Sequence, residues 1–424
     1  MQRRTKPSAL SPNRPSNVEI LSVLEESFVE LGVFPPDDSN RVLKRPPNRR
    51  GPTDDTASVR DTVFSYAETL RTIKHLFTLR DYNSIFNDPL HPEKLAVYSA
   101  EYVAGRALAY ADLFSSEESV RNVLGRAKED TVVVTCLGGG CGSEMVGLTA
   151  CLMRNAFLST SQSISTSAEF SAVSESQSSH QGTSKTGLIV HVVDFGDYAN
   201  ILDTLEHSMR SSWGLSRHQI GYSFHKADIL DLFRPRMSDS QSQSITTASI
   251  ITLLFTLNEL FRSSKKDTVG LVEGLVHKMR PGALLLCADS SGSFSELEIS
   301  TTSNKSGGEI TASAKQSRKQ AHTLGNARTS QTRTATPKDP ESSGENPEAS
   351  GGRVVPVYRL LDLLATPSRS NPRPHFELVY STDARWFRVE DGVNATERGG
   401  KSFRGAYPVK VENMRYWCRI LRKV

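Results

Sequence analysis

The chain has 424 residues, of which 37% are hydrophobic and 7% aromatic, and its formal net charge is +4 at pH 7. This composition indicates that much of the chain lies outside any hydrophobic core, although the length allows two or three domains. The charge excess is too small to predict a nucleic-acid-binding protein by itself. No apolar run reaches membrane-spanning length, and the N-terminal residues include arginines but no apolar segment of signal-peptide type, so we expect a soluble nuclear or cytoplasmic protein.

The cysteines form no C-x-x-C pair, and several lie in apolar runs; they are Cys136, Cys141, Cys151, Cys287 and Cys418. This pattern predicts reduced thiols in an intracellular compartment. No spacing of Cys or His residues indicates zinc ligands, so we predict no metal site.

The N-terminal part of the chain divides into a basic segment and a helical region. Residues 1–60 are rich in Pro, Arg, Ser and Asp, and we expect them to be mostly disordered around a short amphipathic helix at 20–34. An RNA-binding arm is the alternative. Residues 61–130 carry apolar side chains at helical spacing, with Asp61 or Thr62 placed to cap the first helix. We predict a helical cap that either covers the substrate side or packs on a sheet.

A glycine-rich turn organises the rest of the chain. Residues 132–137 read VVVTCL, a run suited to a strand buried on both faces, and a helical pattern begins at Glu144. A dinucleotide-binding turn would place its third glycine at position 143, which is Ser143 here. The glycines instead follow G-x-G-x-G spacing in a cradle of nucleotide size, and the candidate cofactor-binding residues of this turn are Gly138, Gly139, Gly140 and Gly142.

An acidic residue at the end of the second strand is expected to bind ribose hydroxyls. Residues 159–186 are serine-rich, and we predict a disordered insertion there. The second strand then reads LIVHVV and ends in Asp194. Asp194 is therefore the candidate ribose carboxylate. The alternative is an ordinary strand-end aspartate that caps the following helix.

Two further strands end in polar residues. The third strand, at 220–226, is followed by Asp228. The fourth, at 249–256, is followed by Asn258 and Glu259. In a doubly wound sheet the fourth strand lies beside the first, so its carboxyl end opens at the switch point where ligands bind. Asn258 and Glu259 are the candidate catalytic residues, and helix capping is the alternative.

The C-terminal part supplies the remaining strands. Arg280, Pro281 and Gly282 separate a helix from the hydrophobic strand at 283–289. Residues 290–353 form a second low-complexity insertion, to which we assign no structure, and a short helix follows. The last two strands are predicted at 375–381 and 414–421.

The G-x-G-x-G turn resembles the first motif of class I S-adenosylmethionine-dependent methyltransferases, and the Arg-Pro-Gly-led strand resembles their fifth strand. Together with LGGGCGSE, FTLNELF and RYWCRIL, these motifs resemble the fungal methyltransferases that modify N3 of a uridine in large-subunit (25S) ribosomal RNA. The resemblance implies an α/β, Rossmann-like fold at 131–424, with a seven-stranded, mostly parallel sheet and an antiparallel last strand. It implies S-adenosyl-L-methionine as cofactor, with Asp228 beside the adenine amino group.

If uridine is the substrate, its N3 must lose a proton before methyl transfer, and Glu259 is the candidate base. Asn258 would hold a uracil carbonyl, and Asp289 is the reserve base. The target base must be unpaired or extruded. It could stack on an aromatic residue of the last hairpin, with neighbouring arginines on phosphates; these residues are Trp386, Phe387, Arg385 and Arg388. A packed hairpin is the alternative.

Two other functions remain open from the sequence. One is a catalytically inactive, methyltransferase-like protein that binds during ribosome assembly. The other is a small-molecule or protein methyltransferase. We expect large-subunit ribosomal RNA or a pre-ribosome as partner, no membrane, a monomer, and a nuclear, nucleolar or cytoplasmic location.

Overall fold

The computed structural model describes ten stretches of the chain: 15–34, 65–155, 187–233, 239–291, 296–299, 353–367, 372–394, 396–398, 401–403 and 407–424. Several sequence predictions lie outside these residues. They are the disordered segment at 1–60 apart from 15–34, the caps Asp61 and Thr62, the insertion at 159–186, and most of the insertion at 290–353.

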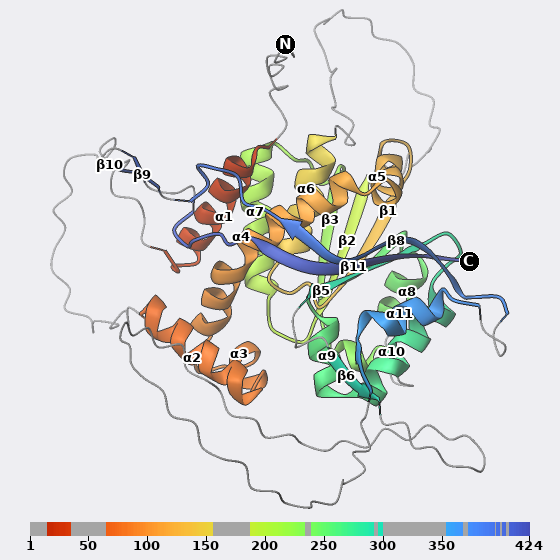
Figure 1. The fold of residues 1–424 in the computed structure, drawn as a ribbon. Helices are drawn as coiled ribbons and strands as arrows, with labels where there is room; N and C mark the ends of the chain where they lie inside the picture. The colour runs from red at the N-terminus through yellow and green to blue at the C-terminus, as the bar shows by residue number, and fades with distance from the viewer. Residues whose placement is uncertain are drawn as a thin grey trace, which may run out of the picture.

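A seven-stranded sheet forms the centre of the fold (Figure 1). Its strands are, in spatial order, β3 (Ile220–Lys226), β2 (Leu188–Asp194), β1 (Val132–Leu137), β4 (Ile250–Leu254), β5 (Leu284–Ser290), β11 (Met414–Lys423) and β8 (Phe376–Phe387). The first five strands are parallel, and β11 runs antiparallel to both of its neighbours. The predicted fold class, with its antiparallel last strand, is confirmed.

The central strands are apolar on both sides because each side of the sheet is covered. Along β1, Val134 and Cys136 pack into one core cluster, whereas Leu137 packs into the other. Thr135 is also fully buried, and its hydroxyl donates to the Ser244 carbonyl at 2.7 Å. An unbroken run of β-branched and apolar residues is what such a two-sided strand requires.

Two helical layers enclose the sheet (Figure 1). The first layer contains α1 (Asn17–Glu30), α4 (Glu93–Ser116), α5 (Glu118–Gly125), α6 (Ser143–Arg154) and α7 (Ala199–Trp213). The second contains α8 (Asp239–Thr246), α9 (Leu257–Ser263), α10 (Lys265–Lys278) and α11 (Tyr358–Leu364).

Helix α1 packs into the core, and it corresponds to the short amphipathic helix predicted at 20–34, although it begins and ends a few residues earlier. Ser16 and Glu19 form a capping box at its start, and Phe28 is fully buried. Arg154 at the end of α6 donates to the Pro15 carbonyl at 2.7 Å and to the Asn17 side chain at 2.6 Å. These contacts fix α1 on the first layer.

The helices of the predicted helical cap pack in two different places. Helix α4 packs along α6 and joins the core, as the packing alternative proposed. Helices α2 (Tyr66–Leu79) and α3 (Asn83–Phe86) extend beyond it, and the residues that join them line a cavity described below. Ser65 precedes α2 but makes no side-chain capping hydrogen bond.

Two local predictions were wrong. The ends of the segment at 290–353, to which no structure was assigned, pair as an antiparallel ladder of β6 (Glu296–Ile299) and β7 (Arg353–Pro356). Strand β8, predicted to end at 381, continues to Phe387. Helix α8 precedes β4 and had no counterpart in the sequence analysis. Strand pairing and packing stabilise these polar segments, and sequence periodicity does not report them. The last hairpin also carries the small ladder of β9 (Thr396–Arg398) and β10 (Lys401–Phe403).

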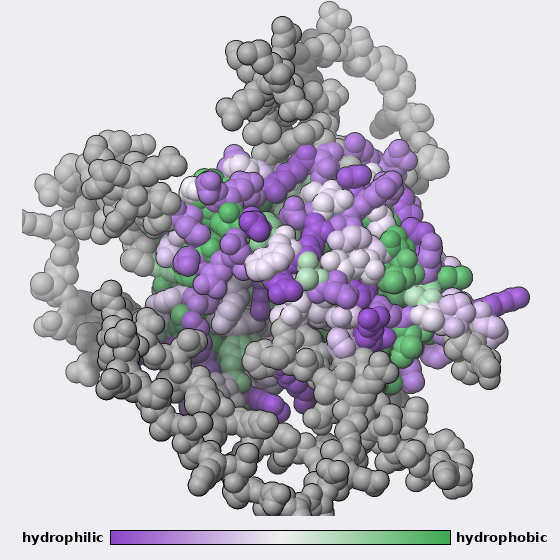
Figure 2. Space-filling view, viewed as in Figure 1, coloured by the Kyte–Doolittle hydropathy of each residue, from purple (hydrophilic) through white to green (hydrophobic). Residues whose placement is uncertain are grey.

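On the face in Figure 2, hydrophilic residues cover most of the described area and the hydrophobic areas are separate. None of the helices in the described ranges is long and apolar enough to cross a membrane.

Candidate active site

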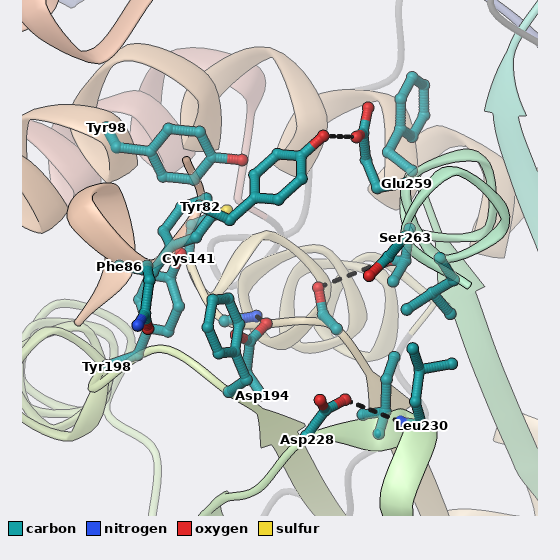
Figure 3. Close-up of a pocket in the computed structure, with 18 of the residues that line it drawn as sticks. Tyr82, Phe86, Tyr98, Cys141, Asp194, Tyr198, Asp228, Leu230, Glu259 and Ser263 are labelled. Carbon is teal, nitrogen blue, oxygen red and sulfur yellow. Dashed lines mark hydrogen bonds between the residues drawn. The ribbon is translucent and has the colours of Figure 1, made fainter. Parts of the chain in front are cut away.

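A cavity of about 410 Å³ opens at the carboxyl ends of the parallel strands (Figure 3). Its walls come from the α2–α3 segment, from α4, and from the segments that follow β1, β2, β3 and β4. Segments far apart in sequence meet here because parallel strands end at one edge of a sheet, and the order of strands changes direction at β1.

The glycine turn forms the floor of the cavity through bare backbone. Gly138 has φ +79°, a left-handed conformation that favours glycine. A Cβ on Gly140 would lie 2.2 Å from the Tyr198 ring and 2.7 Å from the Asp194 carboxyl carbon. Gly138 and Gly140 line the cavity, whereas Gly139 faces the Glu144 carboxylate and Gly142 faces α7. Two of the four predicted glycines, Gly138 and Gly140, therefore form part of the cavity wall.

Asp194 lies directly against this turn, as predicted. Its Oδ2 accepts a hydrogen bond from the Gly140 amide and its Oδ1 from the Gly196 amide, each at 3.0 Å. Burial raises the pKa of Asp194 to about 6, although these backbone hydrogen bonds oppose the shift. Helix α7 has no side-chain cap at its start, so the capping alternative for Asp194 is wrong.

Asp228 also lines the cavity, as expected for a ligand contact after β3. One of its carboxylate oxygens accepts from the Leu230 amide at 2.9 Å, which orients the side chain. Phe195, Ile229 and Leu230 supply apolar surface between the two acids. This corner combines hydrogen-bond acceptors with flat apolar walls, which suits a nucleoside.

The residues after β4 separate into cavity-facing and buried groups. Glu259 lines the cavity, and its carboxylate accepts a hydrogen bond from the Tyr82 hydroxyl and pairs with Arg262 at 3.0 Å (Figure 3). Asn258 is only 4% exposed and is not among the lining residues. Asp289 accepts from the Asn258 backbone amide at 2.9 Å and thereby caps α9. The structure thus brings one of the two predicted catalytic residues to the cavity.

Burial raises the pKa of Asp289 to about 6 and that of Glu144 to about 8. Hydrogen bonds from the Asn258 and Ser290 amides to Asp289, and from the Thr252 hydroxyl to Glu144, oppose these shifts. Neither carboxylate lines the cavity. We therefore assign both to the support of the site, and the reserve base Asp289 is a helix cap.

The sequence analysis missed an aromatic wall on the cap side of the cavity. Tyr82 and Phe86 have nearly parallel rings, 8° apart, and Phe86 also contacts Tyr98 and Tyr198. Arg106 lines the same wall. Tyr98, Tyr102 and Arg106 follow one another at intervals of four residues on α4, so their shared face was a usable signal in the sequence.

Part of the last hairpin is packed, as the alternative proposed. Phe387 is buried, and Arg385 forms ion pairs with Glu117 and, at 2.9 Å, with Asp112. These two residues therefore act in packing. Trp386 is 56% exposed, and the Arg415 guanidinium lies 5.7 Å from its ring centroid. Arg388 lines a separate small hollow beside Trp386.

A family profile described as "Putative SAM-dependent methyltransferase" matches residues 54–422. The 25S rRNA (uridine(2843)-N(3))-methyltransferase of Saccharomyces cerevisiae is 25% identical over 236 residues, or 55% of this chain. The match spans 60% of that curated relative's length.

Solved structures of methyltransferases are also similar, at low identity. A SAM-dependent methyltransferase from Methanosarcina mazei matches with a TM-score of 0.30 and 9% identity, covering 70% of this chain and 93% of the other. TehB from Haemophilus influenzae matches with a TM-score of 0.28 and 11% identity, covering 74% and 67%. The fold assignment rests on the strand order of this chain's own sheet.

Proposed function

The chain belongs to the family of S-adenosylmethionine-dependent methyltransferases that it matches over residues 54–422, and on this premise we propose that it methylates N3 of a uridine in large-subunit ribosomal RNA. The observation that carries the proposal is a single cavity with two unlike walls. The wall of glycine turn, Asp194 and Asp228 suits the cofactor, and the wall of Tyr82, Glu259 and aromatic rings suits a flat acceptor.

The residues present fit S-adenosylmethionine. The backbone at Gly140 leaves space that a Cβ would fill, and Asp194 presents a carboxylate at the same point. In the proposal, Gly138 and Gly140 contact the methionine part, Asp194 holds the ribose hydroxyls, and Asp228 accepts from the adenine amino group. Gly139 and Gly142 shape the turn from behind. When bound, the cofactor supplies a methyl group on a sulfonium, which is already an activated leaving group.

The protein then has to orient the acceptor and remove its proton. Holding nucleophile and methyl in line supplies much of the acceleration. Glu259 accepts the N3 proton, and the hydrogen bond from the Tyr82 hydroxyl orients its carboxylate. Bound S-adenosylmethionine would supply the methyl group to N3, and its sulfur would keep the electron pair of the broken methyl–sulfur bond. Asn258 is buried beside the site, so its contact with a uracil carbonyl is not part of this proposal.

Two exposed features support an RNA acceptor. Trp386 presents its ring beside Arg415, a combination that stacks on a base and contacts phosphate. Arg80 is exposed at the edge of the cavity, where a phosphate of the flanking nucleotide would lie. The target uridine must be unpaired or extruded to enter. The proposed partner is large-subunit ribosomal RNA or a pre-ribosome. In this proposal the protein acts as a monomer, and it acts in the nucleus, nucleolus or cytoplasm.

Methyl transfer to RNA tests the proposal. Large-subunit RNA from a strain that lacks this protein is incubated with the purified full-length chain and methyl-labelled S-adenosylmethionine, and the labelled nucleoside is identified. We expect 3-methyluridine. Label in another nucleoside, or none in RNA, contradicts the assignment. Glu259→Gln should lower the transfer rate about 100-fold with unchanged cofactor affinity, because general bases contribute roughly that factor.

A further inference from the structure

Two arginines line the cavity, and Arg106 is partly buried whereas Arg80 is exposed. Arg106 extends from the middle of α4, and it lies over the ring of Phe255, 5.5 Å from the centroid, and over Tyr102, 5.3 Å from the centroid. Phe255 is the first residue after β4 and has φ +57°, an unusual conformation for a non-glycine residue. The guanidinium is thus held between two aromatic rings at the end of the strand that borders the switch point.

Among the residues that the structure describes, Arg106 makes one side-chain hydrogen bond. A guanidinium carries five N–H donors, and its Nη1 donates to the Tyr98 hydroxyl at 3.3 Å. Within the described ranges, no carboxylate lies within 4.0 Å of it, whereas Arg385 and Arg419 each pair with two acids. A partly buried cation without an ion-pair partner is costly unless a ligand supplies the anion.

We propose that Arg106 is a catalytic residue that donates hydrogen bonds to a carbonyl oxygen of the acceptor uracil and stabilises the negative charge formed when N3 loses its proton. This inference rests on the proposed uridine-N3 activity. Loss of the imide proton spreads negative charge over N3 and both carbonyl oxygens. A fixed guanidinium next to that charge stabilises it in the low dielectric of the cavity. Glu259 accepts the N3 proton, and Arg106 favours this transfer because it stabilises the deprotonated uracil.

The competing role for Arg106 is to bind the carboxylate of the cofactor's methionine part. Its position favours the acceptor, because its aromatic contacts belong to α4 and to the residue after β4, whereas the predicted cofactor contacts follow β1, β2 and β3. The two roles differ in what they change. An arginine on the methionine carboxylate sets cofactor affinity, whereas one on the imide sets the rate of transfer.

The experiment compares wild type with Arg106→Gln and Arg106→Lys. The matched control is Arg217→Gln, which removes an exposed arginine before β3, at the opposite edge of the sheet. Calorimetric titration gives S-adenosylmethionine affinity, thermal unfolding reports folding, and single-turnover transfer to large-subunit RNA is followed across pH. We expect Arg106→Gln to lower the rate about 100-fold, as loss of an oxyanion donor does, with affinity within threefold of wild type. Arg106→Lys keeps the positive charge but loses the planar guanidinium with its paired N–H donors. Its transfer rate should therefore lie between those of wild type and Arg106→Gln.

A chemical probe separates this role from a structural one. In an RNA transcript with 5-fluorouridine, fluorine withdraws electrons and makes the N3 proton more acidic, so the deficit of Arg106→Gln should shrink by at least tenfold. Higher pH should shrink it too. Other titratable groups around Arg106 contribute to the pH profile, so the comparison is always with wild type; they are Tyr98, Tyr102, Tyr110, Cys141, Glu144, Tyr198, Glu259 and Asp289.

The outcomes are distinguishable. A wild-type rate in Arg106→Gln, an equal deficit on both RNAs, or a loss of S-adenosylmethionine affinity beyond tenfold overturns the role of Arg106 and leaves the proposed function standing. If wild type binds S-adenosylmethionine but labels no uridine in RNA, the proposed function fails and this inference fails with it.

Discussion

Replacing Asp194 with asparagine should stabilise the cofactor-free protein and weaken cofactor binding at the same time. The carboxylate is partly enclosed beneath the cavity, and burial raises its pKa from 3.8 to about 6. Between these two values the folded state holds a proton that the unfolded state has released. Stability therefore falls as the pH rises through this window, and the ionised Asp194 destabilises the folded protein above it.

The magnitude follows from the shift of about 2 pKa units, which corresponds to about 3 kcal/mol at most. Asparagine has the same shape and no charge. At pH 4 both side chains are neutral, and the two proteins should be about equally stable. At pH 8 the free energy of unfolding of Asp194→Asn should be about 1 to 3 kcal/mol higher than that of wild type. The lower figure takes account of water in the cavity, which would hydrate the ionised carboxylate and reduce the cost of its burial.

The same substitution should lower S-adenosylmethionine affinity about 10- to 100-fold, because charge-assisted hydrogen bonds to the ribose hydroxyls are lost and each is worth about 1.5 to 3 kcal/mol. Urea unfolding at pH 4, 6 and 8 gives the stability, and calorimetric titration gives the affinity. Asp203→Asn on the exposed side of α7 is the matched control and should change neither quantity. A variant that is no more stable at pH 8, or that binds the cofactor as wild type does, would refute this reasoning.

Three further predictions test other parts of the site. Gly140→Ala places a Cβ against the Tyr198 ring and should weaken cofactor binding at least tenfold, whereas the control Gly270→Ala, with open space around it, should bind normally; calorimetry distinguishes them. Glu144→Gln should become more stable than wild type as the pH rises from about 4.5 to about 8, because burial raises the pKa of Glu144 from 4.5 to about 8; urea unfolding at pH 4 and 9 shows whether the gap opens. Arg419→Gln breaks one ion pair that joins β11 to α11, through Asp362, and one that joins β11 to β8, through Asp383. It should lower the free energy of unfolding by about 2 kcal/mol without changing cofactor affinity; an unchanged urea midpoint contradicts this.

The sequence by itself determined the sheet and the cofactor side of the site. Runs such as 132–137 and 284–290 must be strands buried on both faces. Gly138 and Gly140 follow the first strand, and Asp194 ends the next strand, which lies beside it, so a doubly wound fold places this turn against Asp194. These relations depend on residues close to strand ends, and strand ends are local features. They could therefore be predicted without knowing how the helices pack.

Only the tertiary structure decided the acceptor side. Asn258 and Glu259 are adjacent in sequence, but the helical turn of α9 buries one and directs the other into the cavity. Asp289 caps α9 because that helix packs against it. Arg385 forms an ion pair with Asp112 because α4 packs against the last hairpin. Tyr82 and Arg106 reach the cavity from a cap more than a hundred residues away from Glu259. The four-residue spacing of Tyr98, Tyr102 and Arg106 shows that they share a helix face. Which element that face meets depends on the three-dimensional path of the chain, which this spacing does not report.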